Sequence, residues 1–371
     1  MGLRTHYLFD LLVTTAGLLT LIVYWFRSSR SWVRLVILGV AAIVLAGAVL
    51  APMRIGNRFP NGFVQWTRSL SIFVTAWVLF SIPVLLALRA GQRFQPGRRK
   101  ALKAAAAVAL GSPAVIGAAA FINRERLTFR EVEIAIPGLP KDLNGLRLVQ
   151  LSDIHLSPFV TERLLIHAVG LANETRADLA LVTGDLVSRL GDPLDTCLKH
   201  LATLRSTAGT YGCMGNHEIY ASAEGYTKVR GARLGMDFLR GESRPLLFGD
   251  AMLNLVGVDY QRRGSPYLTN TAGLLVPGAT NVLLSHNPDV FPVAASQGYD
   301  LTVSGHTHGG QINFEILERG VNIARFFTPY VYGSYERDGQ RLFVTRGIGT
   351  VGAPARLGAP PEVALIRLRA I

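Results

Sequence analysis

Acidic residues are nearly absent from the first third of this 371-residue chain. Residues 1–122 carry 13 Lys and Arg but a single acid, Asp10, whereas residues 123–371 carry 25 basic and 24 acidic side chains. The formal net charge of +13 is therefore +12 in the first part and +1 in the second. A nucleic-acid-binding protein carries its basic excess on a folded domain, but here the excess lies between apolar runs. We therefore predict no nucleic-acid partner.

Cysteine is scarce, and the sequence signatures of covalent catalysis are missing. Cys197 and Cys213 provide neither a disulfide framework nor a CxxC metal motif, so we expect two buried, unpaired thiols. The chain contains no GxSxG nucleophile elbow and no P-loop lysine. No side chain is therefore evident as a catalytic nucleophile.

Charged residues are also missing from the centres of four long apolar runs. These runs, each long enough to cross a bilayer as a helix, lie at 8–26, 32–50, 66–88 and 101–122. Trp25, Trp32 and Trp66 stand at run ends, where aromatic side chains favour the membrane interface. Because a transporter needs ionisable groups at mid-depth, we predict instead that residues 1–122 form a transmembrane anchor of about four helices.

The positive charges between the runs predict the orientation of this anchor. The first and third loops hold nine Lys and Arg, against four in the amino-terminal segment and the second loop, so the first and third loops are expected in the cytoplasm. We therefore predict a multi-pass protein of the cytoplasmic membrane with residues 128–371 outside. Residues 98–103 also resemble a twin-arginine export signal. An ordinary basic loop explains them equally well, and cleavage after Ala120 stays open.

Residues 128–371 have a different texture, in which short apolar runs alternate with helical stretches and glycine-rich turns. This alternation is typical of an α/β domain. We expect strands at 146–151, 178–183, 210–214, 252–258, 281–285, 301–304, 341–345 and 363–368, and helices at 161–173 and 193–204. The sequence thus predicts one α/β domain after the anchor.

Polar residues of metal-ligand type directly follow five of these strands. In chain order they are Asp153 and His155, Asp185, Asn216 and His217, His286, and finally His306 and His308. Because sites in open α/β sheets are built at the carboxyl ends of strands, we expect these side chains to lie together. A lone histidine at a strand end is commonly structural, but that explanation would have to hold at five places in one domain. His6, His167 and His200 stand alone and are assigned no role.

The spacing of these residues suits two metal ions. Asp153 and His155 are two apart in an extended segment, so both side chains point to one side, and His306 and His308 repeat the pattern. The two carboxylate oxygens of Asp185 could bridge two ions. Oxygen and nitrogen ligands without thiolate suit Mn, Fe, Zn or Co. Two such divalent ions would clamp a phosphoryl group and activate a water, so no protein nucleophile is required.

Taken in order, the motifs Asp-x-His, Gly-Asp, Gly-Asn-His-Glu, Ser-His-Asn-Pro and Gly-His-Thr-His resemble those of the calcineurin-like metallophosphoesterases. The resemblance covers residues 144–369, and the stretches 285–289, 306–311 and 345–350 resemble the membrane-associated bacterial branch. It implies a four-layer α-β-β-α sandwich, in which two packed sheets are flanked by helices. The transmembrane anchor lies outside this resemblance and depends on hydropathy alone.

The resemblance also implies a role for each residue of the motifs. Asp185 would bridge two metals, of which the first is held by Asp153, His155 and His308 and the second by Asn216, His286 and His306. His217 would lie beside the metals and stabilise the phosphoryl oxygens or protonate the leaving group. Glu218 would orient the motif that contains it.

These features predict a dinuclear metal-dependent phosphoesterase that hydrolyses phosphomonoester, phosphodiester or pyrophosphate bonds. The membrane anchor and the outward-facing site favour a lipid or cell-envelope ester as the substrate, on location alone. The alternative is a catalytically silent, metal-dependent binding or sensor module on a membrane anchor. The intact ligand set and His217 argue against that alternative. No protein partner is predicted.

Overall fold

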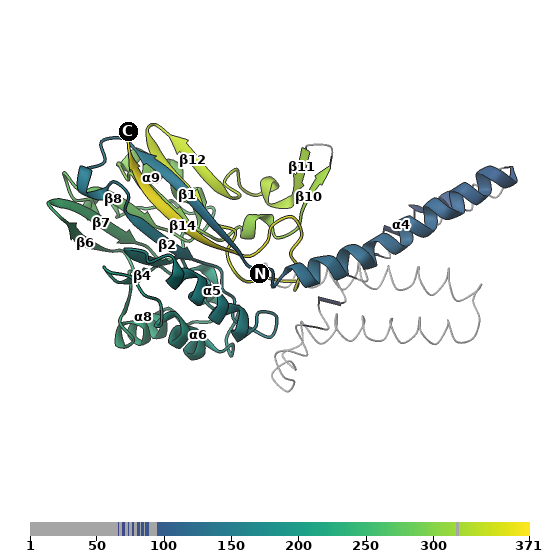
Figure 1. The fold of residues 1–371 in the computed structure, drawn as a ribbon, viewed down its shortest axis with the longest axis horizontal. Helices are drawn as coiled ribbons and strands as arrows, with labels where there is room; N and C mark the ends of the chain where they lie inside the picture. Colours follow the sequence, from purple (N-terminus) through teal and green to yellow (C-terminus); the bar gives the residue numbers. More distant parts are fainter. Residues whose placement is uncertain are drawn as a thin grey trace. The chain divides into compact units, whose positions relative to one another are not determined.

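The computed structural model describes residues 95–316 and 319–371, together with scattered positions between residues 66 and 88 (Figure 1). The chain divides into two compact units, Met1–Ala119 and Ala120–Ile371. The apolar runs predicted at 8–26 and 32–50 lie outside the described residues. In the run at 66–88, the described positions are all helical.

Helix α4 (Pro96–Asn123) contains the fourth predicted apolar run. Its 28 residues extend over about 42 Å, which exceeds the ~30 Å hydrocarbon core of a bilayer. Within the described ranges it is the one helix that is long and apolar enough to cross a membrane, judged by length and composition. The other three predicted spans stay a prediction.

The second unit contains two mixed six-stranded sheets. The first sheet, in spatial order, consists of β1 (Thr128–Ile136), β14 (Glu362–Ala370), β2 (Arg147–Leu151), β3 (Leu179–Val182), β4 (Thr210–Gly212) and β5 (Met236–Phe238). β2 to β5 are parallel, whereas β14 is parallel to β1 and antiparallel to β2. The carboxyl ends of β2, β3 and β4 therefore meet at one edge.

The second sheet has parallel strands at its centre. In spatial order it consists of β12 (Gly333–Arg337), β13 (Gln340–Val344), β9 (Leu301–Ser304), β8 (Thr280–Leu284), β7 (Ala251–Gly257) and β6 (Glu242–Phe248). Its two edge strands pair antiparallel, and the four between them are parallel. β8 and β9 therefore end side by side. A separate hairpin is formed by β10 (Asn313–Ile316) and β11 (Arg319–Asn322).

The remaining elements are short helices and 3₁₀ turns. The helices are α5 (Glu162–Glu174), α6 (Leu194–Leu201), α7 (Asn216–Tyr220), α8 (Glu224–Arg233) and α9 (Phe291–Gln297). The 3₁₀ turns are η3 (Lys141–Leu143), η4 (Ala272–Leu274), η5 (Pro288–Val290), η6 (His308–Gly310) and η7 (Ile323–Phe326).

The two sheets pack face to face through alternate residues of their strands. Leu148 of β2 and Leu181 of β3 share one buried cluster with Leu253 of β7, Val282 of β8 and Val303 of β9. Because β2 and β3 are covered on both faces, they read as continuous apolar runs in the sequence rather than as an alternating pattern.

Helices cover the outer faces of both sheets. Val149 of β2 points away from the second sheet and packs in a cluster with Leu165 of α5 and Leu198 of α6. On the far side, Phe291 of α9 packs against Val344 of β13. The result is a mixed α/β arrangement consistent with a metallophosphoesterase fold (Figure 1).

All eight predicted strands and both predicted helices of this unit overlap elements of the structure. Strands β1, β5, β6 and β12, the β10–β11 hairpin and helices α7 to α9 were not predicted. Most of the missed strands lie at sheet edges, where polar residues interrupt the apolar pattern.

Candidate metal centre

The predicted metal ligands follow the carboxyl ends of strands from both sheets. Asp153 and His155 follow β2, Asp185 follows β3, Asn216 and His217 open α7 after β4, His286 follows β8, and His306 and His308 follow β9. Hydrogen bonds join these turns between the sheets. The His286 ring Nδ1 donates to Thr183 O at 2.7 Å, and the His306 backbone N–H donates to the Asp153 carboxylate at 2.9 Å.

Several of these residues have an uncommon backbone conformation. Positive φ values occur at Asp153 (51°), His155 (49°), Asp185 (57°), His306 (75°) and His308 (52°). Such values in residues other than glycine cost roughly 1–3 kcal/mol each and cluster at functional sites. These turns are therefore held in shape by their surroundings rather than by local preference.

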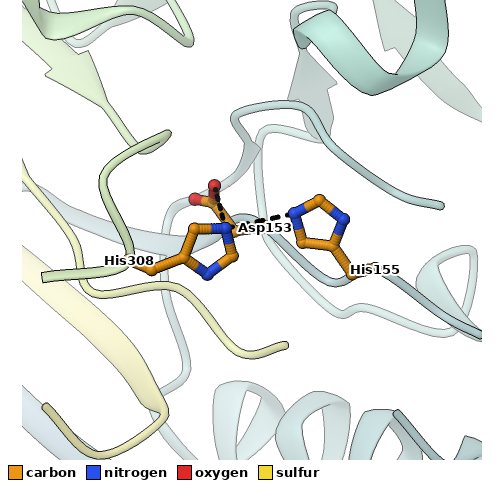
Figure 2. A group of neighbouring side chains, drawn as sticks. All are labelled: Asp153, His155 and His308. Atoms are coloured by element: carbon orange, nitrogen blue, oxygen red, sulfur yellow. Dashed lines mark hydrogen bonds and ion pairs between the residues drawn. The ribbon is translucent and has the colours of Figure 1, made fainter. Parts of the chain in front are cut away.

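Asp153, His155 and His308 form the first group of possible ligands (Figure 2). All three are buried, and their donor atoms lie within 4.8 Å of one another. His308 Nε2 is 3.1 Å from His155 Nε2 and 3.4 Å from Asp153 Oδ1. Ligands on a tetrahedral ion with ~2.05 Å bonds are about 3.3 Å apart. The spacing therefore fits a divalent cation.

Without a metal, the two histidines of this group belong to one hydrogen-bonded row. Arg356 Nη2 lies 3.3 Å from His308 Nδ1, and His155 Nδ1 lies 3.2 Å from Ser188 Oγ. Because a guanidinium can only donate, His308 accepts at Nδ1 and donates from Nε2 to His155. A cation held at His308 Nε2 would require the other tautomer, with the proton on Nδ1, and His308 would then give up the hydrogen bond from Arg356.

Asp185, His286 and His306 form the second group, again with donor atoms within 4.8 Å. Asp185 Oδ2 is 3.1 Å from His286 Nε2 and 3.4 Å from His155 Nε2. One carboxylate thus lies between a histidine of each group. This is the arrangement that a bridging ligand requires.

Two buried atoms at this site make no hydrogen bond in the structure, although buried polar groups normally do. Asn216 Oδ1 is one, and His286 Nε2, which lies in ion-pair contact with the Asp185 carboxylate, is the other. His286 donates its other ring nitrogen to a carbonyl, as metal-bound histidines do. Both atoms are of metal-ligand type. Their lack of hydrogen bonds therefore supports a cation site independently of the ligand spacing.

His217, like His306, is only partly buried among the possible ligands that the structure describes. Its Nδ1 donates to Ser188 O at 2.6 Å, which fixes the ring, and the ring meets His155 edge-on with centroids 4.6 Å apart. His217 also lies within ligand distance of His155 and Asp185. Geometry alone therefore allows it either to bind metal or to act on a substrate from the rim.

Glu218 stabilises the turns after β3 and β4 through hydrogen bonds to their backbone. Its fully buried carboxylate accepts from the backbone N–H groups of Asp185 (2.9 Å), Leu186 (2.7 Å) and Gly215 (2.7 Å). It therefore ties the turn after β3 to the turn after β4. A Cβ on Gly215 would collide with the Asp185 carboxylate, so only glycine permits this close approach.

Arg356 is a second supporting residue, and it was not predicted from the sequence. Its guanidinium is fully buried and donates to backbone carbonyl oxygens of His308 (3.1 Å), Arg346 (2.9 Å), Gly347 (3.2 Å), Gly349 and Ala359 (3.1 Å). It thereby joins η6 to the turn after β13. A single arginine in a Gly- and Pro-rich stretch carries no motif that would have revealed this role.

Electrostatics keep most of the histidines available as ligands. Burial lowers the pKa of His155 to about 3 and that of His306 to about 4. Burial raises the pKa of Asp153 to about 6. Burial also acts to lower the pKa of His286, but the Asp185 and Asp153 carboxylates raise it to about 10. In the metal-free protein His286 therefore carries a proton at pH 7.

Residues that were assigned no role lie elsewhere. His200 pairs with Glu162 at 2.5 Å, and His6 lies outside the described residues. His167 is exposed on α5. Cys197 and Cys213 are buried and free, which confirms that prediction.

Comparison with known families adds an independent observation. Residues 146–310 match the family described as calcineurin-like phosphoesterase. The matched segment begins at β2 and ends at η6, so it contains every predicted ligand.

Individual relatives carry related names. A transmembrane protein with metallophosphoesterase domain from Bos taurus is 31% identical over 308 residues, which cover 77% of this chain and 67% of that protein. An uncharacterized metallophosphoesterase from Campylobacter jejuni is 30% identical and covers 65% of this chain and 63% of its own length. The phosphodiesterase YaeI of Escherichia coli is 29% identical over 60% of this chain and 82% of its own. The chain thus spans less than two thirds of the C. jejuni relative.

Proposed function

This chain belongs to the calcineurin-like metallophosphoesterase family, and we propose that it is a dinuclear metal-dependent phosphoesterase. Its substrate would be a phosphomonoester, phosphodiester or pyrophosphate, drawn from the lipids or other esters of the cell envelope. Residues 128–371 would be the catalytic α-β-β-α domain, and residues 1–122 the multi-pass anchor that holds it outside the cytoplasmic membrane.

The position of Asp185 carries the proposal. Its Oδ2 lies between His155 of one ligand group and His286 of the other, at 3.4 and 3.1 Å. A single-metal site would need no shared carboxylate. Two groups that share one suit a pair of ions about 3.5–4 Å apart, the spacing of two-metal phosphoesterases.

The ligands are assigned by group. Asp153, His155 and His308 would hold one ion, Asn216, His286 and His306 the other, and Asp185 both. When bound, two divalent cations such as Mn, Fe, Zn or Co supply Lewis-acid chemistry and lower the pKa of a water.

His217 would move the proton of the reaction. Because its Nδ1–H is fixed on Ser188 O, its Nε2 is the nitrogen free to face a substrate. With a proton there, the ring donates to a phosphoryl oxygen or gives that proton to the leaving oxygen. General acid–base groups of this kind contribute about 10²–10⁴-fold to a rate.

The experiment is hydrolysis of bis-p-nitrophenyl phosphate and of its monoester by the full-length chain in detergent, with Mn added and EDTA as control. We expect metal-dependent turnover and two bound metals per chain. The Asp185→Ala variant should lose both the turnover and the binding of two metals. His217→Ala should keep two metals and lose about 10²–10⁴-fold in rate. The exposed His167→Ala is the matched control. Two bound metals without turnover on any ester would favour the silent binding module.

A further inference from the structure

Two exposed aromatic side chains stand on a loop that is hydrogen-bonded to the turn carrying His306 and His308. We call residues 322–331 the aromatic loop, because it carries Phe326 and Phe327 one after the other. Their side chains are 81% and 64% exposed, and Phe326 is the most exposed large apolar residue in the part of the chain that the structure describes. Scattered exposed apolar residues are ordinary, but adjacent aromatics next to a site indicate a contact surface.

The aromatic loop is fixed to the turns that carry the ligands. Near its start, Asn322 Nδ2 donates to Gly309 O at 2.9 Å, and at its end Thr307 Oγ1 donates to Val331 O. Between them, Thr328 Oγ1 donates to Asp289 Oδ1 at 2.5 Å. The loop is therefore tied to both the His306–His308 turn and the turn after His286. Its aromatic pair cannot fold into the core without breaking these bonds.

Positive charge accompanies the aromatic pair. Arg325 precedes it, and a second loop at 259–267, the basic loop, exposes Arg262 and Arg263. None of the three arginines forms an ion pair with a residue that the structure describes. The one acid of the basic loop, Asp259, is already bound by Arg240 at 2.7 and 2.8 Å.

Both loops are attached to the same short turn. Asn287 Nδ2 donates to Gln261 O of the basic loop at 2.8 Å, and Asp289 accepts from the aromatic loop two residues later. Leu268 N–H donates to Gln261 Oε1 at 3.0 Å and closes the basic loop. The cations and the aromatic pair therefore flank one point, the turn that follows His286.

We propose that the aromatic and basic loops together form a docking rim that seats the metal centre on an anionic lipid bilayer. Phe326 and Phe327 enter the boundary between head groups and acyl chains, where amphipathic surfaces insert their aromatic residues. Arg262, Arg263 and Arg325 pair with lipid phosphates.

The chain itself favours a bilayer as the occupant. Helix α4 is long and apolar enough to cross a membrane, judged by length and composition, and only four residues connect its end at Asn123 to β1 of the unit that carries the rim. Within the two loops three arginines are exposed, and the one acid, Asp259, is already paired with Arg240, so the loops suit a surface of negative charge. The proposal concerns binding and does not depend on which ester is hydrolysed.

The test places a nitroxide at Phe326→Cys in the full chain, reconstituted in nanodiscs of phosphatidylcholine alone or mixed with phosphatidylglycerol. Cys197 and Cys213 are fully buried, so the unsubstituted chain gives the labelling background. Leu247→Cys is the matched control, because Leu247 is 70% exposed on the edge strand β6. Relaxation by oxygen and by a water-soluble nickel complex reports whether each label lies in lipid or in water.

In discs with phosphatidylglycerol we expect the label at 326 to be oxygen-accessible and shielded from nickel, and the label at 247 to show the reverse. Each Arg→Glu change at 262, 263 or 325 should reduce the ratio of oxygen to nickel accessibility at label 326 by about fivefold or more, most strongly at low salt. A label at 326 as nickel-accessible as that at 247 would overturn the proposal, as would a label shielded from both agents by protein. Lipid insertion without hydrolysis of any ester would leave the rim standing and remove the proposed activity instead.

Discussion

Replacing Glu218 by Gln tests whether a buried carboxylate holds the metal turns together. The side chain is fully buried, and its two oxygens accept three backbone N–H groups at 2.7–2.9 Å. Oε2 receives Asp185 and Gly215, and Oε1 receives Leu186. A glutamine has the same shape but offers one acceptor oxygen and one donor amide.

The expected loss follows from these contacts. The Gln oxygen would keep the two N–H groups now bound by Oε2, at the weaker strength of neutral hydrogen bonds. The amide would face the Leu186 N–H, so one bond is lost and two donors oppose each other. Hydrogen bonds to charged groups contribute about 1.5–3 kcal/mol and neutral ones about 1 kcal/mol. The sum is a loss of about 3–5 kcal/mol in unfolding free energy.

The assay is thermal unfolding of the metal-free full chain, with exposed Glu174→Gln as the matched control. For a unit of this size 1 kcal/mol shifts Tm by about 2–4 °C, so Glu218→Gln should melt roughly 6–20 °C lower. Metal titration should also show weaker binding, because Asp185 and Asn216 lie on the turns that Glu218 joins. Burial and the nearby Asp185 raise the pKa of Glu218. A variant that melts like the parent would therefore show a protonated carboxyl and refute the reasoning.

Three further outcomes follow from buried charges. Arg356→Lys should lower the unfolding free energy by about 3–5 kcal/mol, since an ammonium cannot satisfy five buried carbonyl oxygens, and Tm should fall accordingly. Because the pKa of His286 is raised to about 10, metal binding at pH 7 should release about one proton from it, seen by calorimetry in two buffers of different ionisation enthalpy. His155 and His306 have folded pKa values of about 3 and 4, below the unfolded ~6.5. The unfolded chain thus binds more protons, and the metal-free protein should lose stability as pH falls below about 6.5. The raised pKa of Asp153, about 6, offsets part of that loss, and melting between pH 7.5 and 5 measures the net effect.

That these side chains would lie together could be predicted from the sequence because the signals are local. Each ligand follows a strand that reads as an apolar run, and parallel strands bring their carboxyl ends to one edge. Asp153 and His155 lie with His308 in one group, but their positive φ values show that they do not stand in the extended segment expected from their i, i+2 spacing. The assignment of each residue to a metal stays a prediction.

The edge strand β1 was missed because charged residues interrupt its apolar pattern, although Ile134 and Ile136 lie in the core. In β1, Glu131 and Glu133 alternate with apolar residues and pair with Arg367 and Arg369 of β14. β6 contains Pro245, which interrupts the pattern expected of a strand. Arg356 was missed for another reason. Its partners are carbonyl oxygens brought together only by the fold, and backbone groups leave no mark in a sequence.

The strained turns depend on two buried charged side chains, Glu218 and Arg356. Positive φ at five ligand residues costs roughly 1–3 kcal/mol each, so the turns need bonds from outside themselves. Glu218 supplies them to the turns after β3 and β4, and Arg356 to those after β9 and β13. Both side chains bond mainly to backbone groups, and Arg356 contacts the His308 ring at Nδ1, so they fix the geometry while the Nε2 atoms of the histidines stay open to a cation. The turns after β3 and β4 present N–H groups, which a carboxylate accepts. The turns after β9 and β13 present carbonyl oxygens, to which a guanidinium donates. Asp185 is held by the first support and touches His155, whose partner His308 is held by the second. The two supports therefore act on one connected set of ligands, which explains how a strained arrangement persists in the fold before any metal binds.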